Sequence, residues 1–519
     1  MKTGRLPQGV TLQESRRTFR MKKQQRGGVE TKCASSHAAA AGWTAINWKK
    51  CERRVRKLQA RIVKAQKERR WDRVKALQHL LVTSFEAKAL AVKRVTSNKG
   101  KRTAGVDKVR WTTPASKLKA IKSLKRRGYR PKPLKRVFIE KSNGKKRPLG
   151  IPTMQDRAMQ ALYLMALEPV TETMADGNSY GFRKKRSTAD AMDALHRLLS
   201  RKCSPQWILE GDIKGCFDHI SHEWLADNVQ IDKTILGKWL KAGVVFNKIL
   251  TPTREGTPQG GIISPALANA TLDGMERMLG ERYQKRYLGK GKFYVPKVNL
   301  IRYADDFVVT AESKGLLEEI KPLLTDFLAQ RGLSLSVEKT LITHIGDGFD
   351  FLGFNVRKYN GKLLIRPSMK SRKKITGRLH EIIFSNKAAT QGRLIEELNP
   401  VITGWGNYFR HVASKEVFAS IDHVLFLQLK RWAIRRHANK SRKWVRDKYF
   451  HTDKNRKWIF TETVEQDGSR NTFTLRKLAD IPIIRHLKIK MDANPFDALW
   501  HGYFEDRQSA RLRFAARSV

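Results

Sequence analysis

The sequence has few of the features that stabilise secreted, zinc-containing or membrane proteins. Its four cysteines are scattered without paired spacing, at Cys33, Cys51, Cys203 and Cys216. This usage predicts a reducing compartment, with neither disulfides nor a zinc site. The chain has no run of about 18 apolar residues and no apolar signal core after its basic start, so we expect no membrane span and no membrane partner.

Acidic residues are also scarce. The 519 residues include 48 Asp and Glu against 105 Lys and Arg, which gives a formal charge of +57. An excess of this size repels itself in a free globule and attracts polyanions. Nucleic acid is therefore the expected partner, and the release of counterions from its phosphates should make binding sensitive to salt.

The N-terminal part divides into an arm and a helical region. Residues 1–41 are polar and basic, which predicts a disordered arm, with an organelle transit peptide as the less favoured alternative. Residues 42–130 carry apolar side chains at three- and four-residue steps, which indicates helices. Residues 51–75 hold eleven Lys or Arg and three acidic residues. This excess favours a surface that faces phosphates, with Arg53 and Arg54 as candidate RNA contacts, over a merely solvated helix face.

Two adjacent carboxylates, Asp305 and Asp306, stand between the apolar runs 300–301 and 307–309. Short β-rich runs joined by a polar turn predict a hairpin, and two carboxylates at its tip repel each other unless a cation lies between them. A third carboxylate, Asp212, follows a strand predicted to be buried. Two strands that each end in Asp can converge at one edge of a sheet, where Mg²⁺ would find the oxygen ligands it prefers. An acidic surface turn is the alternative for the 305–306 pair alone.

Seven stretches of the chain occur in an order that resembles the group II intron-encoded reverse transcriptase/maturases of bacterial type. They are residues 141–152, 179–188, 212–217, 256–261, 303–306, 332–340 and 349–354. The resemblance covers roughly residues 45 to 500. It implies an α+β right-hand polymerase, with fingers and an antiparallel palm sheet over residues 131–365 and an α-helical thumb/maturase domain over residues 366–480. The helical region 42–130 would extend the fingers and bind RNA.

The resemblance assigns the catalytic roles to the three carboxylates. Asp212, Asp305 and Asp306 would hold two Mg²⁺ ions and organise nucleotidyl transfer. Phe217 would lie beneath the sugar of the incoming nucleotide and exclude a 2′-hydroxyl, although a core phenylalanine is the alternative. Gln259 would contact template and nucleotide, beside glycines that let the backbone approach closely.

Cations of the fingers are expected at the triphosphate. A hairpin turn at 143–144 is flanked by basic residues, of which Arg147 is the first candidate and Lys141 the second. Contact with template phosphates is the alternative for each of them. The resemblance also implies nucleotide contacts for Ile213 and Lys339, and a plain surface lysine explains Lys339 equally well.

The predicted thumb carries a second basic segment. Residues 430–448 hold nine Lys or Arg and one Asp, interleaved with two tryptophans. Cations and planar rings together can grip an RNA backbone and stack on unpaired bases. The candidate RNA contacts are Arg435, Arg436, Lys440, Trp432 and Trp444, with buried packing the favoured alternative for both tryptophans.

The last segment, 481–519, is expected to be a basic tail and a candidate DNA-binding remnant. Many relatives continue into a zinc-stabilised His-Asn-His endonuclease, whereas this chain has no cysteine beyond Cys216. We therefore expect no endonuclease.

Taken together, these patterns predict an RNA-directed DNA polymerase that uses deoxynucleoside triphosphates and two Mg²⁺ ions. As a maturase it would bind group II intron RNA and assist splicing, and it would support intron mobility by target-primed reverse transcription. The expected partners are the intron RNA, target DNA and an RNA template with a DNA primer, in the bacterial cytoplasm and at the nucleoid during activity. Two alternatives stay open: a reverse transcriptase recruited to phage defence or repair without an intron, and an RNA-binding splicing factor with an inactive polymerase.

Overall fold

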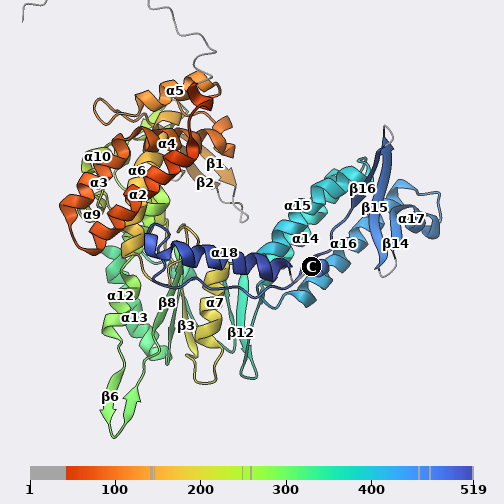
Figure 1. Cartoon of the computed structure of the whole chain (residues 1–519). Coiled ribbons are helices and arrows are strands. Elements are labelled where there is room, and N and C mark those ends of the chain that lie inside the picture. The colour runs from red at the N-terminus through yellow and green to blue at the C-terminus, as the bar shows by residue number, and fades with distance from the viewer. Residues whose placement is uncertain are drawn as a thin grey trace, which may run out of the picture.

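The computed structural model describes residues 42–140, 144, 146–247, 249–257, 260–453, 456–466 and 469–516. The predictions for the arm 1–41, for Lys141 and for Gln259 lie outside these residues. Figure 1 shows three parts: a helical bundle with the fingers strands, a central palm, and a thumb that extends to one side. This is the predicted α+β right-hand arrangement, which is confirmed.

The N-terminal bundle packs around one long helix, α6 (Met154–Met174). Its other members are α2 (Trp48–Lys67), α3 (Trp71–Thr83), α4 (Phe85–Ser97), the short η1 (Lys99–Arg102) and α5 (Pro114–Ser123). N-cap side chains begin α2 and α4: Asn47 accepts a hydrogen bond from a backbone N–H of α2, and Ser84 accepts one from α4. The predicted apolar stripe is confirmed, because Val55, Ile62 and Leu81 are buried in the shared core.

Helix α6 continues through Pro169, although a proline well inside the apolar stretch 154–174 predicts a break near it. Proline removes a backbone donor and crowds the preceding turn, so a lone helix would bend or end there. Here the helix is held on several sides by α2, α3, α4 and α11 (Ser264–Leu272). The Thr173 hydroxyl also donates to the Pro169 carbonyl at 2.7 Å. Tertiary packing therefore overrides the local signal, and the expected break is wrong.

The fingers carry a four-stranded sheet. Its order is β2 (Lys146–Ile151), β1 (Leu134–Glu140), β4 (Val244–Phe246) and β5 (Ile249–Thr251). Between β2 and β4 the chain passes through the palm and then through three short helices, α8 (Cys216–His219), α9 (His222–Asn228) and α10 (Lys233–Leu240). The hairpin β1–β2 therefore lies next to the palm, although the palm strand β3 follows it in the chain.

The palm sheet is antiparallel and buried on both faces. Its order is β10 (Leu341–His344), β3 (Trp207–Asp212), β9 (Asp306–Ala311) and β8 (Asn299–Tyr303). Alternate side chains point to opposite faces. One face joins the core shared with the fingers through Leu209 and Val309, and the other joins the thumb core through Ile208 and Val308. The near-continuous apolar runs of these strands follow from this double burial.

Helices and small elements complete the palm. Helix α7 (Thr188–Leu199) contacts β8, while α12 (Met275–Arg282) and α13 (Lys314–Ala329) contact β8 and β9 respectively. A separate hairpin, β6 (Arg286–Gly289) with β7 (Lys292–Tyr294), projects below the sheet, and η2 (Val337–Lys339) precedes β10. A second sheet of β11 (Phe349–Phe351), β12 (Phe354–Tyr359) and β13 (Lys362–Pro367) leads to the thumb.

The thumb begins as helices and ends in a sheet. The helices are α14 (Met369–Ser385), α15 (Gln391–Phe409), α16 (Lys415–Arg436) and α17 (Arg442–Tyr449); the strands are β14 (Phe450–Asp453), β15 (Arg456–Gln466) and β16 (Ser469–Thr474). The prediction of a wholly helical domain over 366–480 is therefore wrong in its last third. The β-branched residues of 459–464 favour a strand, and Phe460 buries itself against Tyr449.

The described part of the predicted C-terminal tail is packed rather than free. After η3 (Leu478–Asp480) the chain returns to the palm, forms η4 (Ala498–Trp500) and ends in α18 (His501–Ala516), which crosses the centre of Figure 1. Asp497 pairs with Lys67 at 2.6 Å, and the buried Arg507 pairs with Asp190 at 2.7 Å. DNA binding by this segment stays a prediction. No helix among the described residues is long and apolar enough to cross a membrane.

Candidate active site

Strand pairing brings the three predicted carboxylates together. Asp212, the last residue of β3, lies directly opposite Asp306, the first residue of β9. Asp305 occupies the turn between β8 and β9, which the Tyr303–Asp306 pair closes. The predicted convergence of two Asp-ended strands is therefore confirmed by the register of the sheet.

The turn that carries Asp305 is fixed by contacts with residues 180–181. Ala304 has φ of 60°, a left-handed conformation that is uncommon for a residue with a side chain. Gly181 lies so close to Ala304 that a Cβ atom would collide with its backbone. Tyr180 N donates to the Arg302 carbonyl at 2.9 Å, which ties the segment 179–188 to β8. The predicted motif at 179–188 thus supports the turn of the predicted motif at 303–306.

A buried arginine fixes the same strand. Arg302 is fully buried, pairs with Asp273, and donates to the Asn269 side chain at 3.2 Å and the Ala304 carbonyl at 3.3 Å. Burial raises the pKa of Asp273 to about 6, and the Arg302 charge opposes that rise. This pair was not predicted. Its signal is a charged residue, Arg302, inside an otherwise apolar strand, which requires a buried partner.

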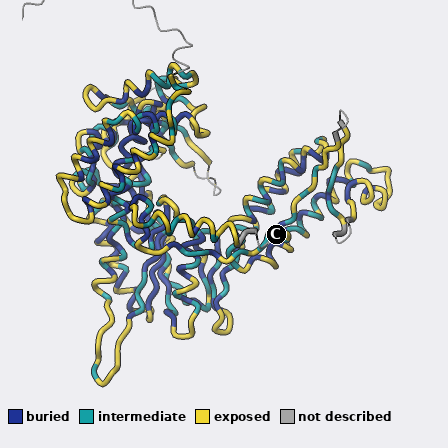
Figure 2. Tube along the Cα trace, in the orientation of Figure 1, coloured by how far each residue is buried: buried dark blue, intermediate teal, exposed yellow. Residues whose placement is uncertain are grey.

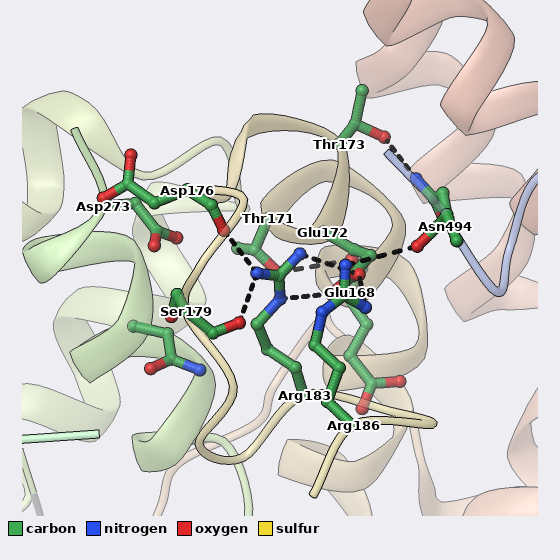
Figure 3. Close-up of polar contacts among 12 residues, drawn as sticks. Glu168, Thr171, Glu172, Thr173, Asp176, Ser179, Arg183, Arg186, Asp273 and Asn494 are labelled. Atoms are coloured by element: carbon green, nitrogen blue, oxygen red, sulfur yellow. Dashed lines mark hydrogen bonds and ion pairs between the residues drawn. The ribbon is translucent and has the colours of Figure 1, made fainter. Parts of the chain in front are cut away.

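A second buried network holds the segment before α7 (Figure 3). The Glu172 carboxylate of α6 forms ion pairs with two arginines: Oε2 lies 2.8 Å from Arg183 Nε, and Oε1 lies 2.6 Å from a terminal guanidinium nitrogen of Arg186. Arg183 also donates to the carbonyls of Asp176 and Ser179. These two arginines are committed to the interior, so they stabilise the palm rather than bind phosphates.

The carboxylates are difficult to ionise together. Burial, followed by the charges of Asp305 and Asp212, raises the pKa of Asp306 to about 7, and Asp306 shares a hydrogen bond with Asp212. Burial and Asp212 also raise the pKa of Asp305, while Arg147 and Lys339 lower it. A cation among these oxygens would remove the repulsion.

Lysine 339 supplies one such charge. Its Nζ lies 2.8 Å from Asp212 Oδ2, and this hydrogen bond is the main cause of its raised pKa. Within the described residues, no three acidic, His or Cys side chains already enclose a metal position. The donor set nevertheless fits Mg²⁺, which binds carboxylate oxygens together with substrate phosphates. Asp212, Asp305 and Asp306 would be its ligands.

A cavity of about 290 Å³ lies between the fingers strands and the palm. Phe217, Arg136, Gly150 and Thr257 are among the residues that line it. Phe217 is 9% exposed and its ring lies edge-on to Phe182, with the centroids 6.2 Å apart. This placement is compatible with both interpretations of Phe217, so its role at the sugar stays a prediction.

The glycine-rich loop forms one wall of the cavity. Thr257 N donates to the Phe217 carbonyl at 2.7 Å, and Gly256, with φ of 81°, abuts Asp218. A Cβ atom on Gly260 would lie 2.8 Å from the Gly150 carbonyl of β2. The predicted close approach of backbone is therefore present, and it joins the loop to both palm and fingers.

The other predicted nucleotide contacts differ in their placement. Arg147 is exposed on β2, and its charge lowers the pKa of Asp305, so its contact with a triphosphate stays a prediction. Ile213 is 2% exposed and pairs with Leu335, so only its backbone remains for a nucleotide. Lys339 contacts Asp212 directly, which sequence reasoning did not anticipate.

The predicted RNA contacts of the bundle are exposed. Arg53 lies on the solvent side of α2, and Arg54 pairs with Glu86 at 2.9 Å. The pair leaves 61% of the Arg54 side chain accessible, so contact with RNA there stays a prediction.

In the thumb, one candidate is corrected. Trp432 is 6% exposed and donates its Nε1–H to the Asn386 carbonyl at 2.9 Å, so base stacking on this ring is wrong and the favoured alternative, buried packing, is confirmed. Arg436 packs over Trp432 and donates to two backbone carbonyls. Arg435 is exposed, and Lys440 lies over the half-exposed ring of Trp444. RNA contacts of Arg435, Lys440 and Trp444 stay predictions.

A palm sheet that presents three carboxylates beneath a basic fingers hairpin defines a nucleotidyl-transferring polymerase of the right-hand class. Three family models match consecutive parts of this chain. They are the N-terminal domain of reverse transcriptase at residues 43–124, the reverse transcriptase (RNA-dependent DNA polymerase) at 139–356, and the group II intron maturase-specific domain at 372–450.

Two curated relatives extend the match. Protein YkfC of Escherichia coli (strain K12) is 36% identical over 311 residues, which cover 53% of this chain and 81% of YkfC. The group II intron-encoded protein LtrA of Lactococcus lactis subsp. cremoris is 30% identical over 372 residues. That match covers 58% of this chain and 62% of LtrA, which is less than two thirds of the relative's length.

The chain belongs to the family of group II intron reverse transcriptase/maturases, and the predicted resemblance is confirmed. It is an RNA-directed DNA polymerase joined to a maturase domain. RNA is accordingly a partner, and Mg²⁺ with deoxynucleoside triphosphates is the general requirement of the family.

Proposed function

We propose that this chain extends a DNA primer on an RNA template at Asp212, Asp305 and Asp306, and that it binds its own group II intron RNA through separate basic surfaces. The observation that carries the first half is the register that sets Asp212 opposite Asp306, with Asp305 in the adjoining turn. The maturase match over 372–450 supports the second half.

Two Mg²⁺ ions held by these carboxylates would assist the primer hydroxyl and the departing pyrophosphate. The side chains of the protein provide the remaining features. Arg147 and Lys339 bring positive charge to the carboxylates, where a triphosphate would also need it. Phe217 and the loop 256–257 shape the cavity that would receive the sugar.

Intron binding would use cations that have no carboxylate partner among the described residues. Arg53 on α2 and Arg435 and Lys440 near the end of α16 are exposed to solvent. Phosphate contacts of this kind supply affinity without chemistry, since they act on the RNA backbone. Splicing catalysis would then belong to the folded RNA. Target DNA, a primer at the target site and intron mobility complete the proposal, with action at the nucleoid of a bacterial cytoplasm.

The proposal is tested with Asp212→Asn, which keeps the shape of the side chain and removes its charge. We expect loss of primer extension on an RNA template in Mg²⁺, with binding of the intron RNA that surrounds the coding region unchanged. The matched control is Asp227→Asn, an exposed carboxylate on α9. Extension by the Asp212 variant at the control rate would overturn the site assignment, and failure of the wild type to bind intron RNA would overturn the maturase role.

A further inference from the structure

The hairpin β6–β7 stands apart from the rest of the palm. Its strands, Arg286–Gly289 and Lys292–Tyr294, pair only with each other, whereas the other palm strands belong to larger sheets. Lys290 and Gly291, with φ of 46° and 70°, form a tight turn between the paired residues Gly289 and Lys292. Figures 1 and 2 show the hairpin projecting below the palm with almost its whole length exposed. Within the described part of the chain, it pairs with no other strand.

Large apolar side chains cover this hairpin. Tyr287 is 64% exposed, Leu288 67%, Phe293 50% and Tyr294 39%. A two-stranded hairpin with no further support is marginally stable in water, and contiguous exposed apolar surface marks interaction sites. A binding partner that buries these apolar side chains would therefore stabilise the hairpin.

The charge of the hairpin identifies the chemistry of that partner. No Asp or Glu occurs between Glu281 and Asp305, while six cations occur there: Arg282, Lys285, Arg286, Lys290, Lys292 and Lys297, besides Arg302 in the buried strand. Among the described residues, Lys297 is the one of these six with a carboxylate partner, Glu312 at 3.5 Å. A polyanion complements such a surface, and a second copy of a chain with formal charge +57 does not.

Aromatic rings and cations are interleaved in space as well as in sequence. Tyr287 lies across from Phe293, with ring centroids 5.1 Å apart, and Lys285 Nζ lies 3.5 Å from the centroid of Phe293. Exposed rings offer stacking surfaces to unpaired bases, and the neighbouring ammonium groups suit the phosphates between them. Rings interleaved with cations in this way favour a single-stranded nucleic acid.

We propose that the β6–β7 hairpin binds unpaired nucleotides of the intron RNA, with bases stacked on Tyr287 and Phe293. The proposal rests on the maturase function, because the RNA concerned is the one that this function requires. It assigns an RNA contact to the palm itself, outside the thumb and the N-terminal helices.

The nucleotides bound there are distinct from the template. The base of the hairpin is fixed at Pro296, whose carbonyl accepts from Glu312 N just beyond the end of β9. The carboxylates lie at the other end of β9, which runs from Asp306 to Ala311. Six extended residues span about 20 Å. An RNA segment on the hairpin therefore does not occupy the catalytic cleft.

The test compares two variants of the full chain. Tyr287→Ala with Phe293→Ala removes the rings, and Lys285→Gln, Arg286→Gln, Lys290→Gln and Lys292→Gln removes four cations. Lys314→Gln with Lys321→Gln on α13, a helix that also carries acidic residues, is the matched control. The probes are the intron RNA that surrounds the coding region, an oligouridylate of about 16 nucleotides, a short primer-template and phosphatidylserine vesicles.

We expect the ring variant to bind intron RNA and the oligouridylate at least about 30-fold more weakly, as loss of two stacked bases implies. The cation variant should lower the salt slope for the oligouridylate by about 3, at roughly 0.7 per phosphate contact. Primer extension on the short primer-template should match the control for both.

Unchanged binding of both RNAs by both variants, beside a wild type that binds intron RNA, would overturn the hairpin proposal and leave the maturase function intact. Loss of vesicle binding with RNA binding unaffected would overturn it in favour of a membrane surface. A wild type that binds no intron RNA would instead overturn the proposed function.

Discussion

The palm and the thumb both carry many charged side chains, but they place them differently. In the palm, Arg302 and Asp273 form a pair with almost no access to solvent, and Arg186 reaches Glu172 in the same way. Near the end of the thumb helices, Arg435 and Lys440 lie in solvent. A desolvated pair is costly to separate, whereas an exposed cation is inexpensive to change. The palm therefore uses charge to fix geometry for chemistry, and the thumb keeps charge available for phosphate.

The largest expected effect is on stability, and it tests this contrast directly. Arg302→Met should lower the free energy of unfolding by about 3–5 kcal/mol, because it leaves Asp273 buried without its partner. Arg435→Met makes the same chemical change on the thumb and should stay within about 0.5 kcal/mol of the wild type. Urea denaturation followed by tryptophan fluorescence measures both. Equal losses in the two variants would show that the contrast is not real.

The second prediction concerns the pH dependence of the carboxylate cluster. Asp306 has its pKa raised from the ordinary 3.8 to about 7 in the fold. A carboxyl of this kind costs stability once it ionises, so without Mg²⁺ stability should be full below about pH 4 and decline as the pH rises through about 7. Thermal melting in EDTA should show this decline, and Asp306→Asn should flatten it.

Added Mg²⁺ sharpens the same experiment. Since the ion binds ionised carboxylates, it should raise the melting temperature of the wild type more at about pH 7.5 than at about pH 5. The increment should be smaller in Asp306→Asn. A Mg²⁺ effect that is independent of pH and of Asp306 would place the ion elsewhere.

These outcomes bear on how much of the site the sequence predicts. The carboxylates were predictable, because a strand that ends in Asp and a turn with two Asp residues are local patterns. The apolar stripes of α2 and α3 were predictable for the same reason. The buried ion pairs that hold the palm in place were not predictable, because their partners lie far apart in the chain. Asp190, for example, pairs with Arg507, 317 positions away.

The errors have the same origin. Pro169 breaks a lone helix but not one that other helices enclose. Trp432 was a candidate RNA contact with buried packing as the favoured alternative, and its contacts with Asn386 and Phe460 decide for packing. The strands β14–β16 were overlooked because basic composition outweighed a short β-branched alternation. In each case the deciding contact is tertiary.

The third prediction is smaller and lies within the active site. Replacing Phe217 with Val should admit ribonucleotides if the ring meets the 2′-hydroxyl, with a loss of discrimination of up to about 100-fold. The ratio of ribonucleotide to deoxynucleotide incorporation on one primer-template measures it. Phe182→Val, which alters the neighbouring ring, is the control. An unchanged ratio in the Phe217 variant would make this residue part of the core.

The smallest effect is expected from the exposed cations. Arg53→Gln, Arg435→Gln and Lys440→Gln together should lower the salt slope for duplex-like RNA by about 3, at roughly 0.9 per lost phosphate contact. Arg436→Gln serves as the matched comparison, since this side chain already bonds to the carbonyls of Lys387 and Ala389. If its slope changes as much as that of the triple variant, a side chain's hydrogen bonds to the protein are a poor guide to RNA contact in this thumb.

The separation of chemistry from RNA binding is tested most directly by one double variant, Asp305→Ala with Asp306→Ala. Its splicing time course on the intron RNA that surrounds the coding region should match the wild type at moderate Mg²⁺, while its primer extension on an RNA template is lost. Circular dichroism would establish that the variant is folded. A folded double variant that no longer promotes splicing, or that still extends a primer, would contradict the division between the palm carboxylates and the RNA-binding surfaces.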